Sequence, residues 1–126
     1  MGEVISVEVS PLALDDLETN LENAAVAASI VPMPFEESIE EIDSWTLAVV
    51  DPPRTGMGPS GVEAVTADRP RAIAYVSCDP ASFARDARLL VDAGYELAWV
   101  APVDMFPQTF HVEMVARFAL TDGLST

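Results

Sequence analysis

The sequence has few of the features that mark secreted, membrane-embedded or disulfide-stabilised proteins. It contains one cysteine, Cys78, so no internal disulfide can form. No apolar run approaches about 18 residues, and no basic segment followed by an apolar core opens the chain. These absences predict no membrane span and no secretory signal. We therefore expect a soluble protein of the reducing cytoplasm.

Positive charge is also scarce. The chain carries 6 basic and 21 acidic side chains, and its formal net charge is −15. An acidic surface repels phosphate groups, which argues against a stand-alone nucleic-acid-binding module. Surface carboxylates that maintain solubility are the simplest explanation of this charge. The length of 126 residues and the apolar content of 50% are typical of one domain with a real core.

Apolar runs predict strands that alternate with helices. Strands are expected at residues 4–9, 28–31, 45–50, 72–76, 95–103 and 112–120. Because strands and helices alternate, we predict an α/β fold with a mainly parallel sheet and helices on both of its faces. The last two strands are joined by a short loop, which predicts an antiparallel C-terminal hairpin. The continuous apolar run 45–50 predicts a strand that is buried on both faces.

Three helices are expected between these strands. One begins at Ser10-Pro11, and its predicted buried stripe is formed by Leu14, Leu17, Leu21 and Ala24. A short helix is expected at residues 62–67. A third helix begins at Pro80 after an Asp79 cap and stops at Gly94; its predicted apolar stripe is formed by Phe83, Ala87, Leu90 and Val91.

Polar residues gather where the predicted strands end, which is where open α/β sheets bind ligands. Glu8 closes the first strand, and Asp51 closes the buried one because Pro52 and Pro53 cannot continue a ladder. Glu8 can instead be a solvated turn residue, and Asp51 can instead be a simple strand terminator. The only histidine, His111, is better explained as a hydrogen-bonding partner than as a metal ligand, and we predict no metal site.

Cys78 follows the strand 72–76 and precedes a helix. A lone cysteine is more often buried filler than a nucleophile. Its place before a helix N-terminus favours the thiolate, whereas an ionised Asp79 beside it opposes the thiolate. The sequence therefore predicts a modestly activated thiol.

Three segments occur in a recognisable order: VVDPPRTGMG, YVSCDPASFARDARLLVDAGY and DMFPQTFHVE. With them, nearly the whole chain resembles the catalytic C-terminal region of the S-adenosylmethionine-dependent RNA (uracil-5-)methyltransferases. The resemblance implies a Rossmann-like methyltransferase sheet. It also implies an enzyme that transfers a methyl group from S-adenosylmethionine to C5 of uridine in tRNA or rRNA, through a covalent adduct between cysteine and uracil C6.

The resemblance also assigns roles to the polar residues. Cys78 would be the nucleophile and Glu113 the general base. Glu8 would bind the ribose hydroxyls of the cofactor. Asp51 would contribute to cofactor binding as well and would help to hold the target base beside the methyl donor. Arg54 and His111 would contact the substrate with Asp51. RNA cytosine-5 methyltransferases carry a further cysteine directly after the strand-end proline, and this chain has none there, so uracil is the expected base.

The chain departs from the family pattern at its start. The usual first strand and its glycine-rich turn are absent, as is the N-terminal RNA-binding part. Residues 1–126 are therefore predicted to be a partial catalytic domain, a C-terminal fragment with little activity alone, whose parent contacts RNA mostly elsewhere. The missing strand would leave sheet edges unpaired. We expect those edges to be filled by strand rearrangement or by another copy of the chain.

Two alternatives stay open. The chain could be a non-catalytic Rossmann-like interaction domain, in which Cys78 is buried and inert. It could also belong to a methyltransferase that acts on another substrate, for which an acidic surface is less awkward.

Overall fold

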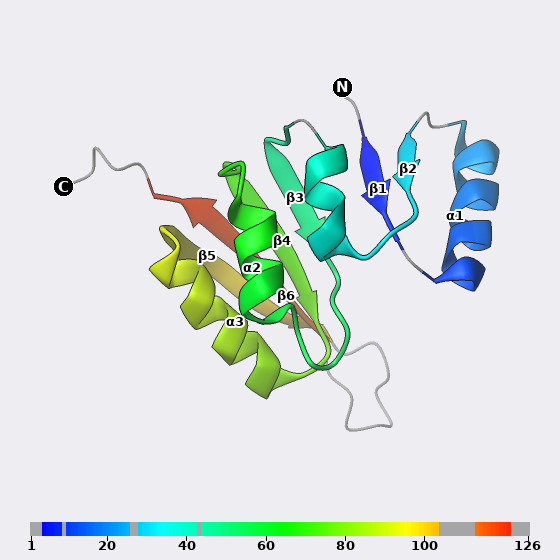
Figure 1. The fold of residues 1–126 in the computed structure, drawn as a ribbon. Helices are drawn as coiled ribbons and strands as arrows, with labels where there is room; N and C mark the ends of the chain where they lie inside the picture. The colour runs from blue at the N-terminus through cyan, green and yellow to red at the C-terminus, as the bar shows by residue number, and fades with distance from the viewer. Residues whose placement is uncertain (1–3, 9, 26–27, 43, 104–112, 122–126) are drawn as a thin grey trace. The chain divides into compact units, whose positions relative to one another are not determined.

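The computed structural model describes residues 4–8, 10–25, 28–42, 44–103 and 113–121 (Figure 1). The chain divides between residues 43 and 44 into two compact units. Each unit is described by itself below.

The first unit holds two short strands and a helix. Strands β1 (Ile5–Val7) and β2 (Ser29–Val31) pair in parallel, with Ile5 opposite Ser29, and the helix α1 (Pro11–Ala24) connects them. Ser10 caps α1 by accepting a hydrogen bond from the Ala13 N–H at 3.5 Å. A 3₁₀ helix, η1 (Phe35–Glu41), follows β2 and was not predicted.

The predicted buried stripe of α1 is wrong within this unit. None of the α1 residues is fully buried. Leu14, Leu17 and Leu21 are half-buried, and Ala24 is exposed. The periodicity identified the apolar side of the helix correctly, but burial also requires a partner surface, and the two short strands supply little of it.

The second unit holds four strands and two helices. Their bounds are β3 (Leu47–Val50), α2 (Gly58–Thr66), β4 (Ala72–Ser77), α3 (Pro80–Asp92), β5 (Tyr95–Val103) and β6 (Glu113–Leu120). The strands form one sheet in the order β3-β4-β6-β5. Strands β3 and β4 are parallel, whereas β6 runs antiparallel to both β4 and β5.

This arrangement confirms the α/β fold and the antiparallel C-terminal hairpin. The four-stranded sheet is mixed and not mainly parallel, because only the β3–β4 pair is parallel. It adds one feature that the sequence did not predict, because β6 inserts between β4 and β5 instead of extending the sheet at its edge. The outer edge of β3 has no strand partner among the residues that the structure describes.

Both helices of this unit lie on the same face of the sheet (Figure 1), so the prediction of helices on both faces is wrong within this unit. Alternate residues of β4 point to that face, so Ile73 and Tyr75 are fully buried, as is Leu90 of α3. The Tyr75 and Phe83 rings meet edge to face, with centroids 5.3 Å apart and planes at 82°. This favourable aromatic geometry fixes α3 against β4.

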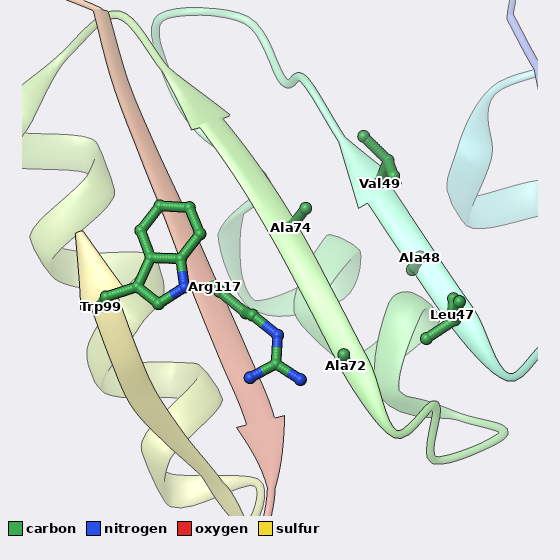
Figure 2. A pocket seen from close by; sticks show the side chains of 7 residues that line it. All are labelled: Leu47, Ala48, Val49, Ala72, Ala74, Trp99 and Arg117. Carbon is green, nitrogen blue, oxygen red and sulfur yellow. The ribbon is translucent and has the colours of Figure 1, made fainter. Parts of the chain in front are cut away.

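The opposite face of the four-stranded sheet is largely bare. Leu47 is 61% exposed and Val49 is 78% exposed, so the prediction that the strand at 45–50 is buried on both faces is wrong. A shallow hollow of about 180 Å³ lies on this face (Figure 2). It is lined by Leu47, Ala48, Val49, Ala72, Ala74, Trp99 and Arg117.

Candidate active site

Asp51 lies just beyond the carboxyl end of β3. Strands β3 and β4 are parallel, with Val50 opposite Tyr75. The segments that follow the two strands therefore both begin at the carboxyl end of the sheet. The Asp51 side chain is exposed and accepts no hydrogen bond from any residue that the structure describes. Its carboxylate is therefore open to a ligand.

Cys78 lies just beyond the carboxyl end of β4 and is half-buried. The Ser77 hydroxyl accepts a hydrogen bond from the Asp79 N–H at 3.2 Å and lies 3.1 Å from the Asp79 carbonyl oxygen. This local network closes the tight turn that carries Cys78. The turn thus holds the thiol between the end of a strand and the start of a helix.

Asp79 caps α3, as the sequence predicted. Its carboxylate accepts a hydrogen bond from the Ser82 N–H at 2.9 Å. Hydrogen bonds from the backbone and the hydroxyl of Ser82, with a smaller contribution from the positive charge of Arg54, hold the pKa of the Asp79 carboxyl below its usual value. Asp79 is therefore an anion next to Cys78 at neutral pH.

Glu113 begins β6 and is half-buried. In the antiparallel pairing of β4 and β6, Ser77 lies opposite Met114. Cys78 directly follows Ser77 and Glu113 directly precedes Met114, so both lie at the same end of the β4–β6 pair. The two residues that the sequence predicted to be catalytic therefore share one end of the sheet.

The other predicted site residues lie in different parts of the chain. Arg54 lies in the loop after Asp51, and its carbonyl oxygen accepts a hydrogen bond from the Ser82 hydroxyl at 2.5 Å. Glu8 follows β1 in the first unit, where its N–H donates to the Val31 carbonyl at 3.2 Å. His111 lies outside the described residues.

No metal centre is evident in the part of the chain that the structure describes. Within it, no group of three or more His, Cys, Asp and Glu side chains could hold a metal ion. The apolar hollow on the bare sheet face contains no residue of the candidate site. Its lining is almost entirely apolar, which suits protein packing better than binding of a polar ligand.

Sequence reasoning missed Asp86, whose side chain is completely buried. It lies three residues after Phe83 and four before Leu90, on the apolar stripe of α3. An acidic residue in the middle of a buried stripe is a signal that could have been found. Val91 was assigned to that stripe instead, and it is 47% exposed.

The second unit combines a mixed sheet with a cysteine and two carboxylates at strand ends. The chain resembles the structure of a Pyrococcus abyssi tRNA (uracil-54, C5)-methyltransferase in complex with S-adenosyl-L-homocysteine, with a TM-score of 0.78 and 32% sequence identity. The match covers 93% of this chain and 28% of that one. The fold is thus that of a Rossmann-like methyltransferase. Residues 38–118 match the family model of tRNA (Uracil-5-)-methyltransferases, so the chain belongs to that family.

Curated relatives agree with this membership. A protein named an uncharacterized RNA methyltransferase from Caldanaerobacter subterraneus subsp. tengcongensis is 43% identical over 118 residues, which covers 90% of this chain and 26% of that protein. Another with the same description, from Oceanobacillus iheyensis, is 39% identical over 127 residues and covers 94% and 27%, respectively. The chain therefore spans about a quarter of the length of these relatives.

None of the helices that the structure describes combines the length and the apolar character needed to cross a lipid bilayer.

Proposed function

We propose that these residues form the C-terminal catalytic segment of a longer enzyme that methylates C5 of uridine in tRNA or rRNA. The methyl donor would be S-adenosylmethionine, and Cys78 would form a transient covalent bond to C6 of the uracil ring. Family membership supports the reaction class. The observation that supports the proposal is the β4–β6 register, because it puts a cysteine and a carboxylate residue at the same end of two neighbouring strands.

The proposed chemistry begins at the Cys78 sulfur. Uracil C5 is a poor nucleophile, so the thiolate first adds to C6, and the electron pair of the C5–C6 double bond becomes available at C5. S-adenosylmethionine, when bound, supplies the electrophilic methyl group for C5. Glu113 then removes the C5 proton, the C5–C6 double bond re-forms, and the C6–S bond breaks with its electron pair returning to sulfur.

Each unit contributes one carboxylate at a strand end to the proposal. Glu8 and Asp51 each follow the carboxyl end of a parallel strand, where ligands bind in this fold class. In the proposal, the Glu8 carboxylate accepts hydrogen bonds from ribose hydroxyls, and the exposed Asp51 carboxylate orients the target base with Arg54. His111 is proposed as a further contact to the substrate.

Covalent trapping tests the proposal. A polypeptide of the relatives' full length that carries these residues is incubated with S-adenosylmethionine and RNA containing 5-fluorouridine. After methyl transfer, the fluorine left on C5 cannot be removed as a proton, so the thiol cannot be eliminated. We expect a stable protein–RNA adduct that Cys78→Ala abolishes. If the wild-type protein forms no adduct, or if Cys78→Ala forms it equally well, the proposal is wrong.

Glu113→Gln tests the second step. An amide cannot accept the C5 proton, so this variant should accumulate adduct with ordinary uridine-containing RNA while releasing almost no methylated product. Glu96→Gln is the matched control, because it removes an exposed carboxylate of the neighbouring strand β5. The control should turn over as the wild type does.

The isolated 126 residues are proposed to bind S-adenosylmethionine weakly or not at all. Their net charge of −15 also makes them a poor RNA-binding surface, so RNA contacts are assigned mostly to other parts of the enzyme. Isothermal titration checks the first statement, and micromolar affinity of the isolated chain for S-adenosylmethionine would contradict it.

Self-association is the last part of the proposal. An edge strand with an exposed apolar face is a template for pairing with another chain. The outer edge of β3 carries no strand partner in the described part of the chain. We assign the template role to this edge, and we propose that a second copy of the chain pairs with it.

A further inference from the structure

The buried carboxylate of Asp86 joins helix α3 to the loop that follows β3. Its Oδ2 accepts hydrogen bonds from the Tyr75 hydroxyl at 2.5 Å and from the Met57 N–H at 2.6 Å. Its Oδ1 accepts from the Gly58 N–H at 3.1 Å and from the Arg85 guanidinium at 3.1 Å. Every neighbour is a donor, so the position requires a side chain that accepts at both ends.

Two further side chains of α3 hold the same loop. The Ser82 hydroxyl donates to the Arg54 carbonyl at 2.5 Å, and its oxygen lies 2.9 Å from the Asp79 carboxylate. The Arg85 guanidinium donates to the Thr55 carbonyl at 2.5 Å. The loop backbone is thus bound at residues 54, 55, 57 and 58 by one helix. We call Ser82, Arg85 and Asp86 the α3 clamp.

Gly56 shows how closely the loop approaches the clamp. Its φ of +77° lies in the left-handed region, and a Cβ atom at this position would lie 2.6 Å from Asp86 Oδ2 and 2.7 Å from Arg85 Nη2. Only glycine allows the backbone to come this near.

The clamp connects the two halves of the candidate active site. The loop it binds begins directly after Asp51, and the helix that bears it begins directly after the turn of Cys78. Ser82 contacts both sides, since it bonds the Arg54 carbonyl and the Asp79 N-cap. A shift of the loop would therefore move Asp51 and Arg54 relative to the thiol.

We propose that Ser82 and Asp86 are positioning residues, which fix the Asp51–Arg54 segment relative to Cys78 so that a base held by one can be attacked by the other. This inference rests on the proposed function. Misplacement of a reacting group by about 1 Å costs roughly 100-fold in rate, so loss of the clamp should slow adduct formation far more than it weakens RNA binding.

The chain offers matched variants. Ser82→Ala removes the hydroxyl that holds Arg54, and Asp86→Asn replaces an acceptor by a donor opposite the Met57 or Gly58 amide. Tyr75→Phe is the control, because it removes the bond to Asp86 from the core side and leaves the bonds to the loop intact.

Amide hydrogen exchange in the 126-residue chain tests the clamp without any activity. Asp86→Asn should lower the global stability and so speed the exchange of all protected amides. Beyond that general increase, the Met57 and Gly58 amides should exchange about tenfold faster. In Tyr75→Phe these two amides should change only as much as the global protection does. Equal behaviour of both variants would overturn the clamp, and this readout stands even if wild-type protein traps no RNA. If Asp86→Asn does not fold, the same comparison is made with the Arg54–Gly58 amides of Ser82→Ala.

Trapping by the longer polypeptide tests positioning. Ser82→Ala should form the 5-fluorouridine adduct at least about tenfold more slowly, with RNA affinity unchanged. Tyr75→Phe should melt at a lower temperature yet trap within about twofold of the wild-type rate, well below its melting point. The clamp would have only a stabilising role if Ser82→Ala formed the adduct at the wild-type rate. The same conclusion would follow if Tyr75→Phe slowed adduct formation as much as Ser82→Ala does. Absence of trapping in the wild type refutes the proposed function instead.

Discussion

At the residue scale, the chemistry of the candidate site depends on the neighbours of one thiol. Cys78 follows a strand and precedes a helix, and the next residue is an anion whose carboxylate is held by the first turn of that helix. The helix N-terminus and the Asp79 charge act on this sulfur with electrostatic effects of opposite sign. The balance of these two effects can be measured directly, because Cys78 is the only cysteine.

Asp79→Asn should raise the rate of Cys78 alkylation by iodoacetamide at neutral pH about threefold, as expected for removal of a nearby charge in a largely aqueous setting. Asparagine caps helices as well as aspartate does, so stability should change little. Asp92→Asn at the other end of α3 serves as the charge control. A rate no different from that of Asp92→Asn would mean that the Asp79 charge does not act on the thiol.

The two tyrosines predict a loss of stability in alkali. Burial raises the pKa of Tyr75, with a further increase from its hydrogen bond to Asp86, and burial also raises the pKa of Tyr95. Both stay neutral in the folded protein at pH values where the unfolded chain, with its usual pKa of about 10, loses the protons. Their contribution is therefore complete below about pH 10 and is lost as the pH rises further.

The expected slope is up to about 1.4 kcal/mol per pH unit for each tyrosine. Urea denaturation between about pH 9 and 11 measures this slope. All six basic residues are arginine, which stays protonated in this range, so no lysine adds to the pH dependence. Tyr75→Phe and Tyr95→Phe should each remove about half of the slope, although each variant also loses a buried hydrogen bond. An unchanged slope in both variants would refute the assignment.

At the element scale, the loop between β3 and α2 is shaped by contacts with α3 more than by its own sequence. Gly56 in this loop and Gly58 at the first position of α2 have positive φ values, +77° and +70°, but only Gly56 faces another element. A Cβ atom at Gly58 would meet nothing within 4 Å. The pair therefore separates backbone strain from the closeness of the clamp.

Gly58→Ala should cost about 1–2 kcal/mol of unfolding free energy, which is the usual penalty for a left-handed alanine. Gly56→Ala should cost about 3 kcal/mol or more, because it adds displacement of the Asp86 carboxylate from its donors. Chemical denaturation of both variants gives the difference. Equal losses would show that the loop can move away from α3 at no cost.

Also at the element scale, β3 illustrates the limit of hydrophobic pattern. A continuous apolar run is typical of a strand with both faces covered. Strand β3 has this run, yet its Leu47–Val49 side is bare within the second unit. The apolar run indicates that burial of both faces would be favourable for β3. Whether a face is buried depends on which other elements pack against it.

At the scale of the whole molecule, the open edge and bare face of β3 predict self-association. Lysine on an edge strand opposes pairing, so Val49→Lys should shift light scattering toward the monomer. Leu12→Lys in α1 is the control, since Leu12 is 79% exposed and Val49 is 78% exposed. If wild-type protein stays monomeric at high concentration, or if both variants behave alike, β3 is not the contact surface.

The sequence by itself determined the features that depend on near neighbours. These are the order of strands and helices, the cap at Asp79, the end of β3 at Asp51, and the chemical identity of the residues at the strand ends. Caps, prolines and apolar periodicity act within a few residues, so they can be read without knowing the rest of the fold.

The tertiary structure alone decided what lies beside what. Insertion of β6 between β4 and β5 places Glu113 at the same end of the sheet as Cys78, and packing of α3 against the sheet brings Asp86 to Met57 and Gly58. The physical reason is that strand register and helix packing join residues far apart in the chain. A slip of one residue in such a pairing would turn every side chain to the other face without changing any local pattern.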